Sequence, residues 1–206
     1  MSHHLTSGSG GTNNSSAEAK YKSSSEPVPS QHLEQEAQHW HALGIPVVAM
    51  KSKQPLAEWG KWIEGVQTKE EFEAQPWAQA DGFAIVCGVR TSIGYIAAID
   101  FDHKNKAADA IRLGEEIVKR LPKTRVESTI NNGLHLLYFS RKPVGNDSKH
   151  SEKCALELLG KGRICIMAPS VGYSVLSDVE PAVVENISTI FYGLLNEYGV
   201  LEPATQ

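Results

Sequence analysis

The sequence has few cysteines, no long apolar segment and no strong excess of either charge. Its three cysteines, Cys87, Cys154 and Cys165, are widely spaced and form no CxxC pair, which argues against a disulfide framework and against a structural zinc site. The net charge of −4 indicates neither a nucleic-acid binder nor a disordered chain. No stretch approaches the roughly 20 apolar residues that cross a membrane, and the N-terminus lacks the apolar core of a signal peptide. We therefore expect a soluble, cytoplasmic protein with reduced thiols.

The 206 residues are enough for one domain with a sizeable core. Residues 1–31 are rich in Ser and Gly with almost no large apolar side chains, so we expect a disordered tail; residues 32–200 form the predicted domain and 201–206 a second tail. Helices are predicted over 33–43, 104–121 and 180–198, and a further short helix is predicted to begin after a capping box at Thr68. Strands are predicted over 46–50, 83–87, 95–102, 125–129, 134–139, 155–159, 163–168 and 173–176. Residues 141–153 are a predicted polar loop. The fold class is α+β: a mixed sheet with flanking helices and one core.

Two aspartates end the short apolar run from Tyr95 to Asp102. Side chains of a strand alternate between its faces, so Asp100 and Asp102 share one face while Ile99 and Phe101 point into the core. Two carboxylates this close repel each other unless a cation or a shared proton intervenes. Mg²⁺ and Mn²⁺ prefer oxygen ligands of this kind. An Asp-x-Asp pair alone is equally consistent with two solvated acids at the end of a strand.

Two further predicted strands carry polar residues between apolar ones. His135 lies within Leu134–Phe139, and Glu157 lies within Ala155–Leu159 with Leu156 and Leu158 on the opposite face. Taken singly, such a histidine is more often a structural core or edge residue, and such a glutamate more often marks the solvent side of a strand. The order Asp-x-Asp, Gly-x-His, apolar-Glu-apolar is much harder to explain by chance.

This order resembles the three motifs of the archaeo-eukaryotic primase superfamily, and more narrowly the bifunctional primase-polymerase (Prim-Pol) domain of plasmid and phage replication proteins. The resemblance covers roughly residues 35–178. Its segments are Gly44-Ile-Pro-Val-Val48, Lys53-Gln-Pro55 with Trp59, Ile99-Asp-Phe-Asp102, Thr129-Ile-Asn-Asn-Gly-Leu-His135, Leu156-Glu-Leu-Leu-Gly160 and Ile166-Met-Ala-Pro-Ser170. It implies an α+β, RRM-like catalytic core that adds nucleotides to a 3′-hydroxyl by two-metal phosphoryl transfer, with a DNA template and primer and nucleoside triphosphates as partners.

The resemblance also implies roles for the polar residues. Asp100, Asp102 and Glu157 would hold two Mg²⁺ or Mn²⁺ ions, and His135 would contact the phosphates of the incoming nucleotide. The ions of such a site lie about 3.5–4 Å apart and stabilise the attacking and leaving oxygens. This chain carries Asn131-Asn132-Gly133 where many relatives have a Gly-Gly pair, and it has no zinc-binding stem or helicase. We therefore expect extension more firmly than primer synthesis, with a helicase or accessory subunit encoded separately.

Residues around these motifs suit a triphosphate and a nucleic-acid backbone. Gly133 permits close backbone approach to a ligand, and cations can neutralise phosphates even in an acidic protein when they form a local patch. For each cation a solvated surface position is an equally good interpretation, and for Trp59 and Trp62 packing beneath the sheet is favoured over stacking on a base. The predicted nucleotide-binding residues are Asn132, Gly133, His135, Lys161 and Arg163, and the predicted nucleic-acid contacts are Lys51, Lys53, Arg141 and Lys142.

Two other classes of function compete with the polymerase. A nucleic-acid or nucleotide-binding module of a replication or defence complex would retain the fold with little turnover, although it gains nothing from three clustered carboxylates facing a phosphodiester. An aspartate-nucleophile phosphatase should have a downstream lysine and a second acidic pair, and neither is recognisable. A glycosyltransferase with an Asp-x-Asp pair gives no role to His135 and Glu157.

Overall fold

The computed structural model describes residues 30–103, 108–150 and 154–197. The predicted tails lie almost entirely outside these ranges. The helices are α1 (Ser30–Ala42), α2 (Lys69–Glu73), α3 (Ala108–Arg120) and α4 (Ile187–Glu197), with short 3₁₀ turns at Gly60–Ile63 and Trp77–Gln79. The strands are β1 (Val47–Lys51), β2 (Gln54–Pro55), β3 (Gly82–Val86), β4 (Tyr95–His103), β5 (Val126–Ser128), β6 (Leu134–Ser140), β7 (Asp147–His150), β8 (Cys154–Leu159), β9 (Ile164–Met167), β10 (Ser174–Ser177) and β11 (Ala182–Val184).

A four-stranded antiparallel sheet, in the order β2-β1-β3-β9, forms one half of the domain. Its first two strands are joined by a tight turn in which Ser52 and Lys53 have φ values of 48° and 65°. Strand β9 comes from much later in the chain and pairs with β3 through Phe83–Val86. The chain therefore returns from the other half of the domain to add the last strand of this sheet.

A seven-stranded sheet forms the other half: six strands follow the order β10-β5-β6-β4-β8-β7, and the seventh, β11, pairs with β6 off this path. Its pairs are antiparallel except that β11 runs parallel to β6 beside Tyr138–Ser140. On β6, strand β5 pairs with Leu134–Leu136 only, so the later part of β6 is open to β11. Strand β4 lies between β6 and β8 at the centre, which places the Asp-x-Asp segment in the interior of the sheet.

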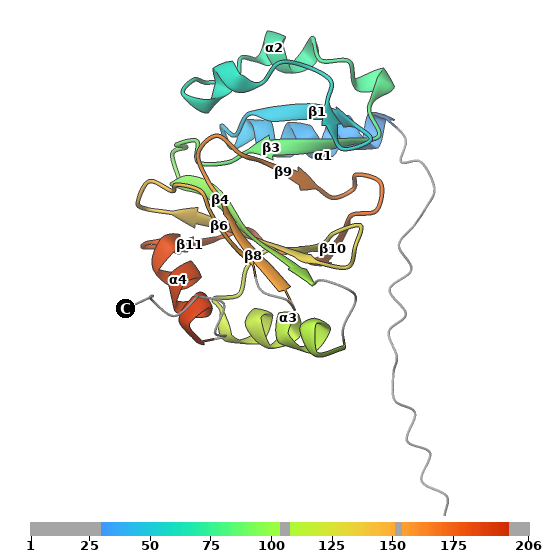
Figure 1. Ribbon diagram of the computed structural model, residues 1–206. Helices are drawn as coiled ribbons and strands as arrows, with labels where there is room; N and C mark the ends of the chain where they lie inside the picture. Colours follow the sequence, from blue (N-terminus) through green and yellow to red (C-terminus); the bar gives the residue numbers. More distant parts are fainter. Residues whose placement is uncertain (1–29, 104–107, 151–153, 198–206) are drawn as a thin grey trace, which may run out of the picture.

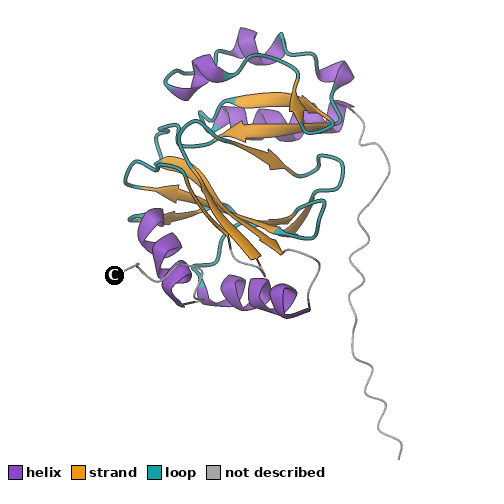
Figure 2. Ribbon diagram, viewed as in Figure 1, coloured by secondary structure: helices purple, strands orange, loops and turns teal. Residues whose placement is uncertain are grey.

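Apolar clusters join the two sheets and cover their outer faces. Figures 1 and 2 show the two sheets one above the other, with α3 and α4 beneath the larger sheet. Between the sheets, Ile96 and Ala98 of β4 pack with α1 and with the inner face of the four-stranded sheet. On the opposite face of the seven-stranded sheet, Ile99 and Phe101 pack with α3 and α4. Buried Trp62 packs on the outer face of the four-stranded sheet. Strand β4 therefore alternates between two cores, and its polar face is directed toward the four-stranded sheet.

The sequence predictions are confirmed in fold class and in most elements. The α+β class holds, and the parallel β11 makes the larger sheet a mixed one. Thr68 and Glu71 form both hydrogen bonds of a capping box at the start of α2, and Gly44 follows α1 with a φ of 79°, the left-handed conformation that ends many helices. No helix in the described ranges is long and apolar enough to span a membrane.

Three structural predictions were wrong. The strands form two sheets and several apolar clusters rather than one sheet over one core. The predicted loop 141–153 contains β7, whose polar sequence suits the edge position it occupies beside β8. The predicted helix 180–198 begins only at Ile187, where the Asn186 side chain accepts a hydrogen bond from the Ser188 amide (3.0 Å). Its expected first turn contains β11, because valines at 183 and 184 favour a strand and β6 offers an open edge.

Candidate active site

Asp100 occupies the centre of a polar row that crosses the seven-stranded sheet. Its direct neighbours are His135 on β6 and Glu157 on β8. Directly opposed residues of an antiparallel pair have Cβ atoms about 4.5–5.5 Å apart, so these three side chains start close together and on one face. The residues on either side of Asp100, Ile99 and Phe101, face the other core.

The three side chains line one pocket of about 320 Å³ at the junction of the two sheets. Its other walls come from β9, from the turn between β8 and β9, and from Trp59 and Tyr173. Asp100 and Glu157 are half-buried and His135 is buried. The structure therefore gathers residues from three separate strand motifs around one space large enough for part of a small ligand.

Asp102 shares the face of Asp100 but lies one step farther along β4. Its register partner on β8 is Ala155 rather than an acid, and it does not line the pocket. Asp102 is half-buried. Of the three predicted acids, the structure thus brings Asp100 and Glu157 together directly and places Asp102 beside them, toward the end of the strand.

His135 has a fixed orientation at the base of this pocket. Its Nδ1 lies 3.0 Å from the Ile166 carbonyl oxygen, which can only accept, so Nδ1 carries a proton and donates. Nε2 then faces Asp100, with 3.6 Å between Nε2 and Oδ1; this distance is that of an ion pair rather than a hydrogen bond. Burial lowers the pKa of His135, but the carboxylates of Asp100 and Glu127 outweigh burial, and the net pKa is raised. Folding therefore shifts the titration of His135 toward the charged imidazolium.

Glu127 extends the polar row on the far side of His135, and sequence reasoning missed it. It is fully buried and is the register partner of His135. One carboxylate oxygen accepts a hydrogen bond from Arg125 Nε (2.7 Å), and the other accepts one from the Ala168 amide (2.7 Å). Burial raises the pKa of Glu127, while Arg125 opposes this rise. The only sequence signal was a pair of opposite charges two residues apart on one face of a strand, which also describes an ordinary exposed ion pair.

Aromatic rings form part of the pocket wall. The Tyr173 ring lies 5.8 Å from the His135 ring, centroid to centroid, and burial raises the pKa of Tyr173 to about 12, so its hydroxyl stays protonated. Trp59 is half-buried and lines the pocket, so of the two tryptophans it is the one placed to meet a ligand. Trp62 is buried and donates from Nε1 to Glu71 (3.1 Å), which is a structural role.

The two cations predicted to bind phosphate lie on different sides of one turn. Arg163 is exposed and lines the acidic pocket. Lys161 is also exposed, but it forms an ion pair with Glu64 and lines a neighbouring pocket. Only Arg163 is therefore positioned beside Asp100 and Glu157.

The remaining predicted cations are distributed over the surface. Arg141 and Lys142 both lie 3.8 Å from carboxylate oxygens of Glu185. Lys51 and Lys53 are exposed at the β1–β2 hairpin, at the opposite edge of the four-stranded sheet from β9. The structure does not bring these four residues into the pocket.

Asn132 and Gly133 form the turn that leads into β6. Asn132 is exposed with a φ of 61°. Gly133 is buried, and a Cβ at this position would lie 2.6 Å from the Phe101 carbonyl oxygen and 2.9 Å from Thr129 Oγ1. Gly133 thus allows the turn to lie close to the backbone of β4. This close contact holds β6 in register with the Asp-x-Asp segment.

The carboxylates of the pocket meet the needs of a divalent ion only together with water and substrate. Among the described residues, no three His, Cys, Asp or Glu side chains are positioned together to hold a metal ion. Mg²⁺, however, commonly binds through one or two carboxylates and completes its shell with water and substrate phosphates. Asp100 and Glu157, adjacent and facing one pocket, fit that requirement, and they are the residues that would hold such an ion.

The fold and the site define an α+β domain with a carboxylate and histidine cluster at a two-sheet junction. A family model described as the N-terminal domain of bifunctional DNA primase/polymerase (Prim-Pol) matches residues 36–186, nearly three quarters of the chain. No curated protein matches the chain. The chain belongs to the bifunctional DNA primase/polymerase family, a family of primase- and polymerase-type nucleotidyltransferases that act on DNA and nucleotides.

Proposed function

We propose that this chain is a template-directed DNA nucleotidyltransferase that adds nucleotides to a 3′-hydroxyl, as a polymerase, a primase or both. The observation that carries the proposal is the placement of Asp100 between His135 and Glu157 in a single pocket. Phosphoryl transfer needs little covalent chemistry from the protein and depends on positioning and on neutralising charge. A row that combines carboxylates with a cation is suited to that task.

The carboxylates are assigned to the divalent ions. Asp100 and Glu157 would hold Mg²⁺ or Mn²⁺, with Asp102 joining from the next position on the same face of β4. When bound, such ions neutralise the triphosphate and activate the 3′-hydroxyl. Without a cation the two adjacent carboxylates repel each other, so the pocket itself favours a positively charged occupant.

The cationic residues are assigned to the triphosphate. His135 is held by the Ile166 carbonyl, and its raised pKa favours a charged ring that presents Nε2–H toward the pocket. Arg163 stands at the exposed rim. Hydrogen bonds from charged donors to phosphate oxygens strengthen as negative charge develops in the transition state. Both residues would therefore stabilise the departing pyrophosphate more than the bound substrate.

The setting of the reaction is proposed on the family resemblance. We infer a role in plasmid- or phage-type DNA replication in the cytoplasm, with a separately encoded helicase or accessory subunit as partner. Lys51, Lys53, Arg141 and Lys142 are proposed contacts for the DNA backbone, and Asn132 and Gly133 for the nucleotide. Exposed ion pairs such as those of Arg141 and Lys142 with Glu185 contribute little, so phosphates can replace the glutamate.

Primer extension on a labelled primer and template tests the proposal. We expect incorporation that requires Mg²⁺ or Mn²⁺ and is lost in Asp100→Asn, which keeps the shape of the side chain but removes its charge. Glu180→Gln is the matched control, because Glu180 is an exposed acid outside the pocket. Incorporation that persists in Asp100→Asn would refute the assigned site. A primer-free assay with labelled nucleotides separates priming from extension.

A second candidate is a nucleic-acid or nucleotide-binding module with little turnover. The observation that favours it is the absence, among the described residues, of three side chains gathered to hold one ion. This function predicts tight DNA or nucleotide binding by the wild-type protein with no metal-dependent incorporation. The same extension assay, run beside a binding assay, distinguishes the two.

A further inference from the structure

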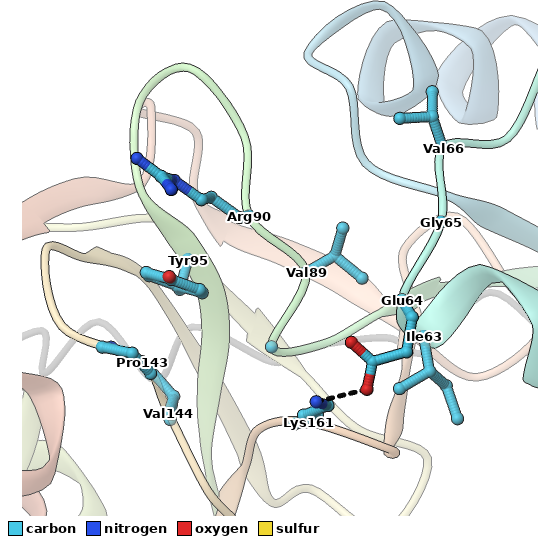
Figure 3. Close-up of a pocket in the computed structure, with 11 residues that line it drawn as sticks. Ile63, Glu64, Gly65, Val66, Val89, Arg90, Tyr95, Pro143, Val144 and Lys161 are labelled. Atoms are coloured by element: carbon cyan, nitrogen blue, oxygen red, sulfur yellow. Dashed lines mark ion pairs between the residues drawn. The ribbon is translucent and has the colours of Figure 1, made fainter.

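A second pocket, of about 390 Å³, lies on the other side of the turn that borders the acidic pocket. Figure 3 shows Tyr95, Pro143 and Val144 on one side of it and residues 63–66 on the other, with Val89 between them. Its volume falls within the range of about 300–1,000 Å³ that is usual for small-molecule sites. The proposed catalytic roles do not use this pocket.

The two pockets share one structural element. Lys161 lines the second pocket, whereas the next two residues, Gly162 and Arg163, line the acidic one. Gly88 allows this turn to lie against the β3–β4 turn, because a Cβ there would be 2.2 Å from the Lys161 amide nitrogen. Tyr95 and Asp100 are five residues apart on β4, about 17 Å at about 3.3 Å per residue, and their side chains lie on opposite faces, since Tyr95 packs on the side of Ile99 and Phe101. The link between the two pockets is therefore the turn at 160–163 and not the face of β4.

The rim of the second pocket carries positive charge that is available to a ligand. Arg90 is exposed, and its side chain makes no hydrogen bond or ion pair with any described residue. Lys161 is paired with Glu64, but the two side chains are 52% and 74% exposed, and pairs this exposed contribute little stability. A phosphate can displace Glu64 from Lys161 at small cost.

The wall of the pocket offers an apolar and aromatic surface. Tyr95 is half-buried, and in Figure 3 its ring lies on the side of Pro143 and Val144. Val66 is 80% exposed, the highest value among the exposed large apolar residues of the described ranges. Aromatic rings beside a cationic groove are the features that proteins use to bind single-stranded nucleic acid, through stacking on bases and neutralisation of phosphates.

From these observations we propose that the second pocket binds one nucleotide of the single-stranded template, with its base against Tyr95 and Val66 and its phosphate on Arg90 and Lys161. This inference rests on the proposed function, since a template is its ligand. The turn at 160–163 would then guide the strand from this pocket toward Arg163 and the carboxylates. The pocket would set the path of the template rather than take part in the chemistry.

Binding of a fluorescent oligothymidylate, measured by anisotropy at several salt concentrations, tests the charge component. For Arg90→Glu we expect affinity to fall about tenfold and the salt dependence to lose about one phosphate contact. Lys123→Glu is the matched control, because Lys123 is an exposed lysine that lines neither pocket. Equal binding by Arg90→Glu and Lys123→Glu would overturn the proposal.

Photocrosslinking tests the position of the base independently. An oligonucleotide carrying 5-iodouracil should crosslink to Tyr95 itself, located by fragment sequencing because Asp100 lies in the same tryptic peptide, and Val66→Asp should reduce the yield. Asp100→Asn should still crosslink at Tyr95, so a failure of the proposed catalytic site is distinguishable from a failure of the pocket. Crosslinking of Tyr95 by a free iodinated nucleoside triphosphate but not by the oligonucleotide would overturn the template assignment, as would an oligonucleotide crosslink confined to other residues.

Discussion

Removal of the Glu127 carboxylate should reveal how strongly the site depends on its buried support. Glu127 is 0% exposed, and each of its oxygens accepts one hydrogen bond, from Arg125 and from the Ala168 amide, both at 2.7 Å. These are charge-assisted bonds in a region shielded from water, where they are strongest. Arg125 is itself 11% exposed and keeps a second partner in Asp178, 2.9 Å away.

The expected cost depends on what the substitution leaves unpaired. Breaking a buried ion pair by removing one partner costs about 3–5 kcal/mol. Because Arg125 retains Asp178, we place Glu127→Ala at the lower end, about 3 kcal/mol. Glu127→Gln keeps one acceptor oxygen, so a single buried donor loses its partner, at about 2 kcal/mol.

Urea denaturation of the purified variants measures these values. Asp178→Asn is the matched control, because it removes the other partner of Arg125 from a position that is 84% exposed, and we expect it to cost less than about 1 kcal/mol. If Asp178→Asn destabilises the domain as much as Glu127→Gln, the buried Arg125–Glu127 pair contributes no more to stability than the exposed pair, which would contradict this prediction.

Two further predictions follow from the same region. Gly133→Ala should lower the free energy of unfolding by about 1–3 kcal/mol, because its Cβ would lie 2.6 Å from the Phe101 carbonyl oxygen. Gly145→Ala is the control in the same denaturation assay, because a Cβ at this position would have nothing within 4 Å. Equal effects of the two substitutions would contradict the prediction. His135 has a pKa raised by folding, so its contribution to stability is fully present below its unfolded value of about 6.5 and is lost as pH rises through the folded pKa. Denaturation across this pH range should show a decline with rising pH that His135→Gln lacks, and a parallel curve for both proteins would contradict it.

Local patterns in the sequence predicted the elements of the site well. The alternation around Asp100 and Glu157 placed both acids on one face and their apolar neighbours on the other, as the structure has them. The capping box at Thr68 was equally readable, because these features depend on residues only a few positions apart.

Non-local packing was beyond the same reasoning. Strand β9 pairs with β3 in the smaller sheet, and its partners Phe83–Val86 lie some 80 positions earlier in the chain. No local pattern in the sequence encodes that pairing. Sequence reasoning missed Glu127 because its second partner, the Ala168 amide, comes from this same distant segment. Lys161 and Arg163 are two residues apart, yet they line different pockets because the turn at 160–163 separates them.

Under the proposed function, Asp100 and Glu157 act as one unit on the reacting phosphates. Single-turnover incorporation by Asp100→Asn, Glu157→Gln and the double variant tests this most directly, with Glu180→Gln as control. Loss of a group that stabilises developing charge typically costs about 10²–10³-fold in rate, and residues that act as a unit are strongly non-additive. We expect each single substitution to cost about as much as the double one. Effects that multiply, or either single variant retaining wild-type incorporation, would contradict it.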